Sequence, residues 1–175
     1  MDVYIRPMTE SDIAPVSRLE AEAFPEDAPT PFHRELENRL ASYLVACCTS
    51  PASNETDLII GYSGSWLVID ESHLLSIAIK AEYRGKGIGE LLLVSALEDV
   101  ISRGAQTMFL EVRISNTMAR SLYEKHGFTR MGVRRGYYAD NNEDAVVMVV
   151  NGIDGPSYIE FLATRKGQII DKLAN

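Results

Sequence analysis

A glycine-rich segment at residues 84–89 is the part of this sequence best suited to bind a ligand. Alternating glycines before a helix let the backbone pass close to a ligand, and free N–H groups at the positive helix end favour a phosphate. The segment matches neither G-x-x-x-x-G-K-[ST] nor G-x-G-x-x-G. A flexible turn that caps the helix is the alternative. The residues concerned are Arg84, Gly85, Lys86, Gly87, Ile88 and Gly89.

One acidic residue, Glu111, interrupts the mainly apolar segment at residues 107–113. A carboxylate in a sheet interior is unfavourable unless it is paired or takes part in chemistry. Burial would also raise its pKa towards the range of a useful general base. We therefore interpret Glu111 as a proton acceptor, with a structural ion pair to Arg113 or Arg135 as the alternative.

The cysteines and histidines form no recognisable ligand set. Cys47 and Cys48 are adjacent, a spacing that does not readily allow a disulfide or a metal site. His33, His73 and His126 are scattered along the chain. We expect a protein without a metal, in which both cysteines pack in a strand and neither acts as a nucleophile.

The hydrophobic pattern predicts the elements that would position these residues. Helical spacing and capping residues indicate helices at residues 13–23, 32–40, 88–102 and 116–126. Residues 51–57 are typical of a polar turn. The order β-α-α-β-β-β-α-β-α-β-β predicts an α/β (α+β) fold, a mixed sheet of about seven strands with helices on both faces. The strands are expected at residues 3–5, 42–49, 58–69, 73–79, 107–113, 128–135 and 145–150.

The length of 175 residues favours one domain, which we place at residues 1–150. Residues 151–175 form a C-terminal extension. Apolar residues at helical spacing predict an amphipathic helix at 157–173, interrupted by Gly167. We expect this helix to pack on the domain; a dimer contact is the alternative, so we expect a monomer or a weak dimer.

The formal net charge of −8 is unevenly distributed. Residues 1–79 hold 4 basic and 13 acidic residues (net −9), residues 80–138 hold 10 and 6 (net +4), and residues 139–175 hold 3 and 6 (net −3). An acidic chain is a poor general partner for nucleic acid or an anionic membrane. The basic middle part suits an anionic ligand, and the acidic first part suits a cationic ligand. Chance clustering of the charges is the alternative. No segment is typical of a signal peptide or membrane span, so we expect a cytoplasmic protein.

Several motifs together resemble one enzyme family. Residues 84–89 match the R/Q-x-x-G-x-G/A loop of the GNAT superfamily of N-acetyltransferases, and the element order up to about residue 150 is similar to that fold. Residues 110–113 (LEVR), Asn116, residues 122–128 (LYEKHGF) and residues 134–138 (RRGYY) resemble the RimI-type ribosomal-protein-alanine N-acetyltransferases. This resemblance implies direct transfer, in a ternary complex, of an acetyl group from acetyl-CoA to the α-amine of a protein N-terminus, such as that of a ribosomal protein.

The same resemblance implies roles for individual residues. Glu111 is implied as the general base and Tyr123 as the proton donor to the departing thiolate, a half-buried core tyrosine being the alternative for Tyr123. Asn116 suits both a helix cap and a hydrogen bond to the cofactor. The residues further implied for acetyl-CoA are Ile77, Ala78 and Ile79, whose backbone would pair with the pantetheine arm, and residues 84–89 with Glu90.

The implied acceptor groove has two walls. Phe24, Glu26 and Asp27 fall where the family's first two helices meet, and Tyr137 and Tyr138 fall in the last hairpin loop. The two carboxylates would favour a cationic N-terminus, with a solvated acidic loop as the alternative. RimI-type enzymes often carry a tryptophan just after the proline, where this sequence has Glu26.

Two other functions fit the same motifs. One is a GNAT acetyltransferase that acts on a small amine or a lysine side chain. The other is a non-catalytic acyl-CoA sensor, against which the retention of both Glu111 and Tyr123 argues.

Overall fold

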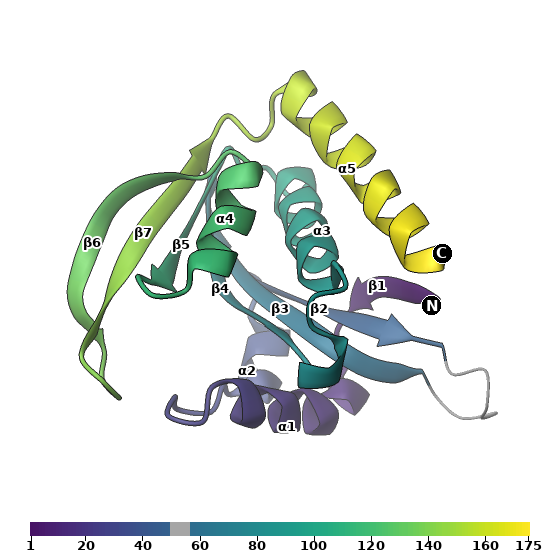
Figure 1. Ribbon diagram of the computed structural model, residues 1–175, viewed down its shortest axis with the longest axis horizontal. Coiled ribbons are helices and arrows are strands. Elements are labelled where there is room, and N and C mark those ends of the chain that lie inside the picture. Colours follow the sequence, from purple (N-terminus) through teal and green to yellow (C-terminus); the bar gives the residue numbers. More distant parts are fainter. Residues whose placement is uncertain (50–56) are drawn as a thin grey trace.

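The computed structural model describes residues 1–49 and 57–175, so the polar turn predicted at residues 51–57 lies, except for its last residue, outside the described part. The described strands form one seven-stranded sheet in the order β1-β2-β3-β4-β5-β7-β6 (Figure 1). Among them, β4 and β5 are the parallel neighbours. This confirms the predicted α/β class and mixed sheet. The strands are β1 (Val3–Pro7), β2 (Ala41–Cys48), β3 (Leu58–Val68), β4 (Glu71–Ile79), β5 (Thr107–Arg113), β6 (Thr129–Tyr138) and β7 (Glu143–Asn151).

Helices cover both faces of the sheet, as predicted. Strand β2 contributes to both resulting cores, since Leu44 and Ala46 pack with α3 whereas Tyr43 and Val45 pack with α1 and α2. Both cysteines are free thiols in this strand, as predicted. The helices are α1 (Ile13–Ala23), α2 (Phe32–Glu37), α3 (Ile88–Ser102), α4 (Thr117–Lys125) and α5 (Pro156–Ala174), with 3-10 turns at Glu10–Asp12 and Ala81–Tyr83.

Strands β4 and β5 separate, which opens the sheet beside the glycine-rich segment. They pair over three residues of each strand, from Glu71 to His73 and from Thr107 to Phe109. Beyond these pairs, β4 continues against β3 and β5 continues against β7. Leu75 is an extra residue in β4, a β-bulge that disturbs the ladder at this point. The separation leaves the facing edge of β4 accessible to a ligand that adds like a strand.

The end of β6 corrects the prediction for Tyr137 and Tyr138. The sequence pattern places both in a hairpin loop, but β6 continues to Tyr138, which pairs with Glu143. The reason is Gly136, whose φ of +58° allows a local bend after which pairing resumes. The connecting loop is therefore restricted to residues 139–142.

Helix α5 lies against α3 (Figure 1). Leu162, Ile169 and Leu173 are buried in the same core as α3, and Lys166 forms a 2.5 Å ion pair with Glu98. The helix continues through Gly167. Within residues 1–49 and 57–175, no helix combines the length and hydrophobicity needed to cross a bilayer.

Candidate active site

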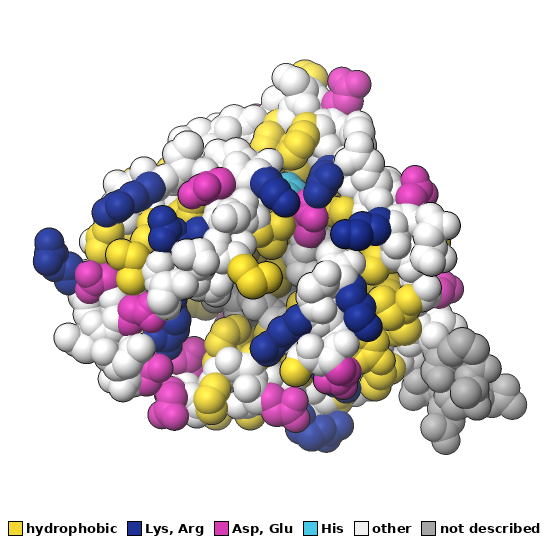
Figure 2. All heavy atoms as spheres, in the orientation of Figure 1, with side chains coloured by type: hydrophobic (Ala, Val, Ile, Leu, Met, Phe, Trp, Pro, Cys, Tyr) yellow, Lys and Arg dark blue, Asp and Glu magenta, His cyan; other side chains and the backbone are white. Residues whose placement is uncertain are grey.

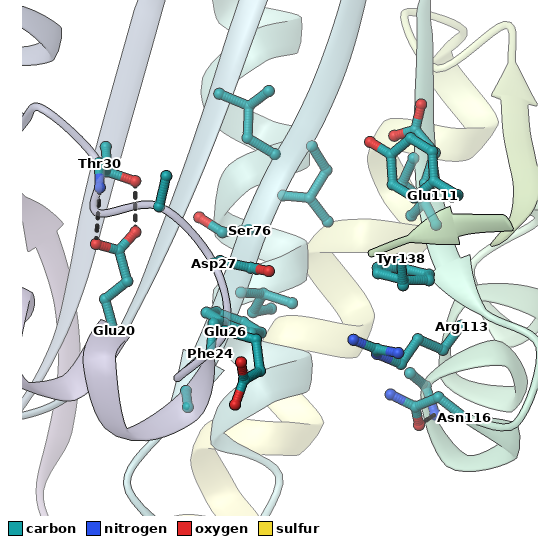
Figure 3. Close-up of a pocket in the computed structure, with 18 of the residues that line it drawn as sticks. Glu20, Phe24, Glu26, Asp27, Thr30, Ser76, Glu111, Arg113, Asn116 and Tyr138 are labelled. Atoms are coloured by element: carbon teal, nitrogen blue, oxygen red, sulfur yellow. Dashed lines mark hydrogen bonds between the residues drawn. The ribbon is translucent and has the colours of Figure 1, made fainter. Parts of the chain in front are cut away.

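A cleft of about 1110 Å³ opens where β4 and β5 separate. Its walls come from the α1–α2 loop, strands β4 and β5, helix α4 and the β6–β7 hairpin. Figure 3 shows acidic side chains of the α1–α2 region on one side, and Glu111, Arg113 and Asn116 on the other. Figure 2 shows Lys and Arg side chains spread over the face that carries α3 and α4.

Glu111 faces this cleft because side chains alternate along β5. Leu110 and Val112 point into the core with α3, which leaves Glu111 on the opposite face of the sheet. Its Oε2 lies 2.6 Å from His73 Nε2, and its Oε1 lies 3.5 Å from Arg134 Nη2. Because an ionised carboxylate can only accept, the His73 Nε2 carries the shared proton.

These contacts correct two expectations about Glu111. Its ion-pair partners are His73 and Arg134, not Arg113 or Arg135. The hydrogen bond from His73 holds the pKa of the Glu111 carboxyl below its usual range, although burial acts in the opposite direction. Glu111 is therefore ionised at neutral pH, not held in the protonated form.

His73 is a site residue that sequence reasoning missed. It is opposite Phe109 in the short paired part of β4 and β5, and its ring stacks on Phe109 with centroids 4.3 Å apart. Glu111 follows Phe109 by two residues and thus lies on the same face. His73 could have been assigned to the site only from the register of the two parallel strands. The sequence alone does not give that register.

Tyr123 lines the cleft from α4, and only 6% of it is exposed. Burial raises the pKa of its hydroxyl to about 12, with a smaller effect from Tyr138. Among the described residues the hydroxyl has no hydrogen-bond partner. Tyr123 thus packs in the core, and its protonated hydroxyl can donate a hydrogen bond at the edge of the cleft.

The glycine-rich segment has a backbone that suits close approach of a ligand. Gly85 and Gly87 have φ values of +75° and +95°, and Gly87 is the residue that precedes α3. Such angles are rare for residues with a side chain. Arg84 Nε donates to the Ile79 carbonyl at 3.0 Å, which ties the segment to the end of β4.

The side chains at the end of β4 pack in the two cores, so mainly the backbone groups of this strand are available to a ligand. Ala78 is buried with α1 and α2, whereas Ile79 packs with α3. Ile77 also packs with α3 and lines the cleft. At the start of α3, the Glu90 side chain is occupied, since its Oε1 accepts from Arg165 Nε at 2.5 Å.

Asn116 confirms its expected role as a helix cap. Its Oδ1 accepts the Ala119 N–H at 3.1 Å at the start of α4. Asn116 also lines the cleft, and its side-chain nitrogen is not used in this cap. Capping and ligand binding are therefore compatible.

The α1–α2 loop is held over the cleft by a buried carboxylate. Glu20 accepts the Thr30 N–H at 3.0 Å, the Thr30 hydroxyl and the Tyr62 hydroxyl at 3.3 Å (Figure 3). This clamp joins α1 to the far end of the loop. Phe24, Glu26 and Asp27, which lie between, line the cleft as the sequence predicts.

Tyr137 and Tyr138 also line the cleft, although they belong to a strand. Arg113 holds this wall in place: its guanidinium lies 3.9 Å from the Tyr138 ring centroid and pairs with Asp140 at 2.9 Å. The two tyrosine rings meet edge to face, with centroids 5.0 Å apart. Arg113 therefore has a structural role that sequence reasoning did not assign.

The charge of the cleft is strongly asymmetric. Its lining side chains contribute seven carboxylates and one guanidinium, that of Arg113. This arrangement favours a cationic ligand on the acceptor side. The carboxylates are Glu20, Glu26, Asp27, Glu35, Glu111, Asp140 and Glu143.

The fold and the cleft together define a class of group-transfer enzyme. A mixed sheet separates beside a glycine-rich turn, and a carboxylate and a tyrosine face the opening. The model of the acetyltransferase (GNAT) family matches residues 13–128, and the chain therefore belongs to the GNAT acetyltransferases. Enzymes of this family take the acetyl group from acetyl-CoA.

Individual relatives are similar over most of the chain. A Bacillus subtilis protein, provisionally named a ribosomal protein bS18-alanine N-acetyltransferase, is 40% identical over 83% of this chain and 93% of its own length. The ribosomal protein bS18-alanine N-acetyltransferase of Salmonella typhimurium is 34% identical over 74% and 83%. The crystal structure of the Escherichia coli ribosomal-protein-S18-alanine N-acetyltransferase has a TM-score of 0.71 and 26% identity, covering 86% of this chain and 94% of that one.

Proposed function

We propose that this protein is an acetyl-CoA-dependent N-acetyltransferase that modifies the α-amine of a protein N-terminus, with a ribosomal protein of the bS18 type as the acceptor. The observation that carries the proposal is the ionised Glu111 carboxylate, hydrogen-bonded to His73 and facing an acidic cleft that Tyr123 also lines. The names of the Bacillus and Salmonella relatives support the acceptor class. An acceptor on the ribosome would place the reaction in the cytoplasm.

Acetyl-CoA fits the gap between β4 and β5. Its pantetheine arm would add to the free edge of β4 at residues 77–79, as an extra strand does. The pyrophosphate would then meet the backbone N–H groups of residues 84–89 at the start of α3. This placement brings the thioester to the cleft, where an N–H near Ile79 can polarise its carbonyl.

The Glu111–His73 pair would accept the proton that the amine must lose. A low pKa makes Glu111 a modest base, so it suits an amine that loses its proton readily. An α-amine has a pKa of about 8, against about 10.4 for lysine. The low pKa of the Glu111 carboxyl therefore favours an N-terminal acceptor over a lysine side chain.

Tyr123 would donate a proton to the sulfur as the C–S bond breaks. Its hydroxyl is protonated at neutral pH because burial raises its pKa to about 12. The amine nitrogen forms the new bond to the carbonyl carbon, and the thiol leaves with the tyrosine proton. The two proton steps fall to different residues, and no acyl-enzyme is needed.

An acetylation assay with two forms of one peptide tests this proposal. A peptide that begins Ala-Arg-Tyr is compared with the same peptide blocked at its α-amine, and acetyl-CoA is supplied to both. We expect acetylation of the free peptide alone. Equal activity on the blocked peptide would show that a side-chain amine is the acceptor and refute the proposal.

A further inference from the structure

The cleft extends beyond Glu111 to a part formed by α2, β2 and β3. Three side chains line it there: Glu35 from α2, Tyr43 from β2 and Trp66 from β3. Trp66 is the one tryptophan of the chain, and 39% of it is exposed. The proposed mechanism uses none of these residues. A carboxylate and an exposed indole therefore line a part of the cleft in which no reaction step needs them.

The strand register connects this part of the cleft to Glu111. Trp66 of β3 is opposite His73 of β4, and His73 is opposite Phe109 of β5. Leu67 packs with α3, so its neighbour Trp66 lies on the other face of the sheet, which also carries Glu111. Two strand spacings of about 4.8 Å separate β3 from β5. The backbones of Trp66 and Glu111 are thus on the order of 10 Å apart across the cleft.

Hydrogen bonds hold the Glu35 carboxylate through one of its two oxygens. Its Oε2 accepts from Trp66 Nε1 at 2.7 Å and from the Tyr43 hydroxyl at 2.9 Å. Burial raises the pKa of Tyr43, so this hydroxyl stays protonated and acts as the donor. Among the described residues, Oε1 has one contact, at 3.5 Å from Asn38 Nδ2, which is at the limit of a hydrogen bond. Oε1 therefore retains the capacity to accept from a ligand.

No cation of the chain neutralises this carboxylate in the part that the structure describes. Within residues 1–49 and 57–175, no Lys, Arg or His nitrogen lies within 4.0 Å of Glu35. The side chain is half-buried, so water screens it less than a carboxylate on an open surface. Glu35 is thus a carboxylate without a counter-ion at the wall of the cleft.

A glycine of β3 makes room for the tyrosine that holds Glu35. Tyr43 and Gly64 are opposite each other in the β2–β3 ladder, and a Cβ built on Gly64 would overlap the Tyr43 ring. The ring therefore lies where any other residue of β3 would place its side chain. From this position the Tyr43 hydroxyl reaches Glu35. The carboxylate is fixed by residues of two strands as well as by its own helix.

A cationic side chain is the ligand that this pair of groups suits. The Glu35 carboxylate can accept from a guanidinium or ammonium group, and the face of the Trp66 indole attracts the same cation. A planar guanidinium is the better match because it can donate hydrogen bonds while it stacks on an aromatic ring. In an acceptor whose α-amine lies at Glu111, the second Cα is about 3.8 Å beyond the first. A long side chain at the second position can span the remaining distance.

We propose that Glu35 and Trp66 form a subsite for a cationic side chain, arginine in preference to lysine, at the second position of the acceptor. Glu35 accepts from the guanidinium, Trp66 stacks on it, and Tyr43 positions Glu35. This inference rests on the proposed N-terminal acetylation and deepens it, since it names the residues that determine its specificity.

Peptides that begin Ala-Arg-Tyr and Ala-citrulline-Tyr test this inference, because citrulline has nearly the shape of arginine without its charge. With the full chain at fixed acetyl-CoA, we expect kcat/KM to be about tenfold higher for the arginine peptide, the effect of one charge-assisted contact. The difference should lie in KM, because the contact is made equally in the ground state and the transition state.

Two variants locate the preference. Glu35→Gln should bring the ratio of the two kcat/KM values close to one, because the amide keeps an acceptor for Trp66 and Tyr43 but loses the charge. Trp66→Leu should also reduce the ratio, because the cation loses its aromatic surface. A general loss of activity cancels, since the ratio is taken within each variant.

Glu37→Gln is the matched control. Glu37 follows Glu35 by two residues on α2 and is exposed, but it does not line the cleft, so this variant should keep the wild-type ratio. Equal kcat/KM for the two peptides in the wild type, or a wild-type ratio in Glu35→Gln, would overturn the inference while α-amine acetylation stands. An equal loss of the ratio in Glu37→Gln would also overturn it, in favour of long-range attraction. Failure of the wild-type chain to acetylate either peptide would instead overturn the proposed function together with this inference.

Discussion

At the scale of single residues, the environment of Glu111 determines its chemistry. The carboxylate is nearly buried, yet it is ionised because His73 and Arg134 both lie within 3.5 Å. Burial alone would favour the neutral form. The hydrogen bond from the His73 imidazole therefore keeps Glu111 ionised and able to accept a proton. We regard His73 as a positioning residue for Glu111.

Replacing His73 with alanine should make the reaction sensitive to acid. The largest cause of the low pKa of Glu111 is then removed, and burial shifts this pKa upward. More Glu111 becomes protonated as the pH falls, so the ratio of variant to wild-type kcat/KM should decrease from pH 8 to pH 5.5. Deprotonation of the amine affects both enzymes alike and cancels in this ratio.

His73→Gln is the control for this experiment because it retains a side-chain N–H donor. It should show a smaller decrease of the ratio than His73→Ala. A ratio that is constant with pH in the alanine variant would contradict the role of His73.

At the scale of elements, local backbone geometry explains why the glycines are separated by one residue. Gly85 and Gly87 have positive φ angles, whereas Gly89 has an ordinary helical conformation within α3. Only the first two need the freedom of glycine. Backbone conformation therefore accounts for two of the three glycines of the motif.

Gly87→Val should weaken coenzyme A binding and lower the stability of the fold. A side chain at a φ of +95° costs about 1–2 kcal/mol and also narrows the approach to the α3 N-terminus. Gly89→Ala is the control, since its Cβ would lie 3.8 Å from Ile79 at an ordinary contact distance. Thermal unfolding measures the loss of stability, and coenzyme A affinity measures the effect on binding. An unchanged coenzyme A affinity in Gly87→Val would exclude this loop as the phosphate site.

Most elements could be predicted from the sequence because their signals are local. The periodicity of 88–102 and the cap at Asn116 match α3 and α4 closely. Strand β6 was predicted too short, since Gly136 usually indicates a turn and only the partner strand shows that pairing resumes at Tyr138. Predicting His73 as a site residue would have required the register between β4 and β5. The paired residues lie about 35 positions apart in the sequence, so no local pattern reveals that register.

At the scale of the whole molecule, the uneven charge has a spatial meaning. The acidic first part and the β6–β7 hairpin place six of the seven carboxylates around the cleft, and Glu111 of β5 is the seventh. The basic middle contains the glycine-rich segment and the start of α3. Under the proposed function, the anionic cofactor would meet the basic part of the chain and the cationic acceptor would meet the acidic part.

A change of acceptor charge should change KM in a salt-dependent way. A peptide beginning Ala-Arg-Tyr should have a lower KM than one beginning Ala-Glu-Tyr, and the difference should shrink when ionic strength rises from 0.01 M to 1 M. The Debye length falls over that range from about 30 Å to about 3 Å. A KM difference that is independent of salt would argue against long-range attraction by the cleft, and steady-state kinetics at fixed acetyl-CoA supplies the measurement.

The proposed mechanism requires Glu111 and Tyr123 for transfer of an acetyl group to an α-amine. A peptide with a free N-terminus and one internal lysine is treated with the wild-type enzyme, Glu111→Gln or Tyr123→Phe, and tandem mass spectrometry locates the acetyl group. We expect acetyl on the α-amine alone, with rates about 10²–10⁴-fold lower in both variants and coenzyme A affinity retained. Acetyl on the lysine, or wild-type rates in both variants, would contradict it.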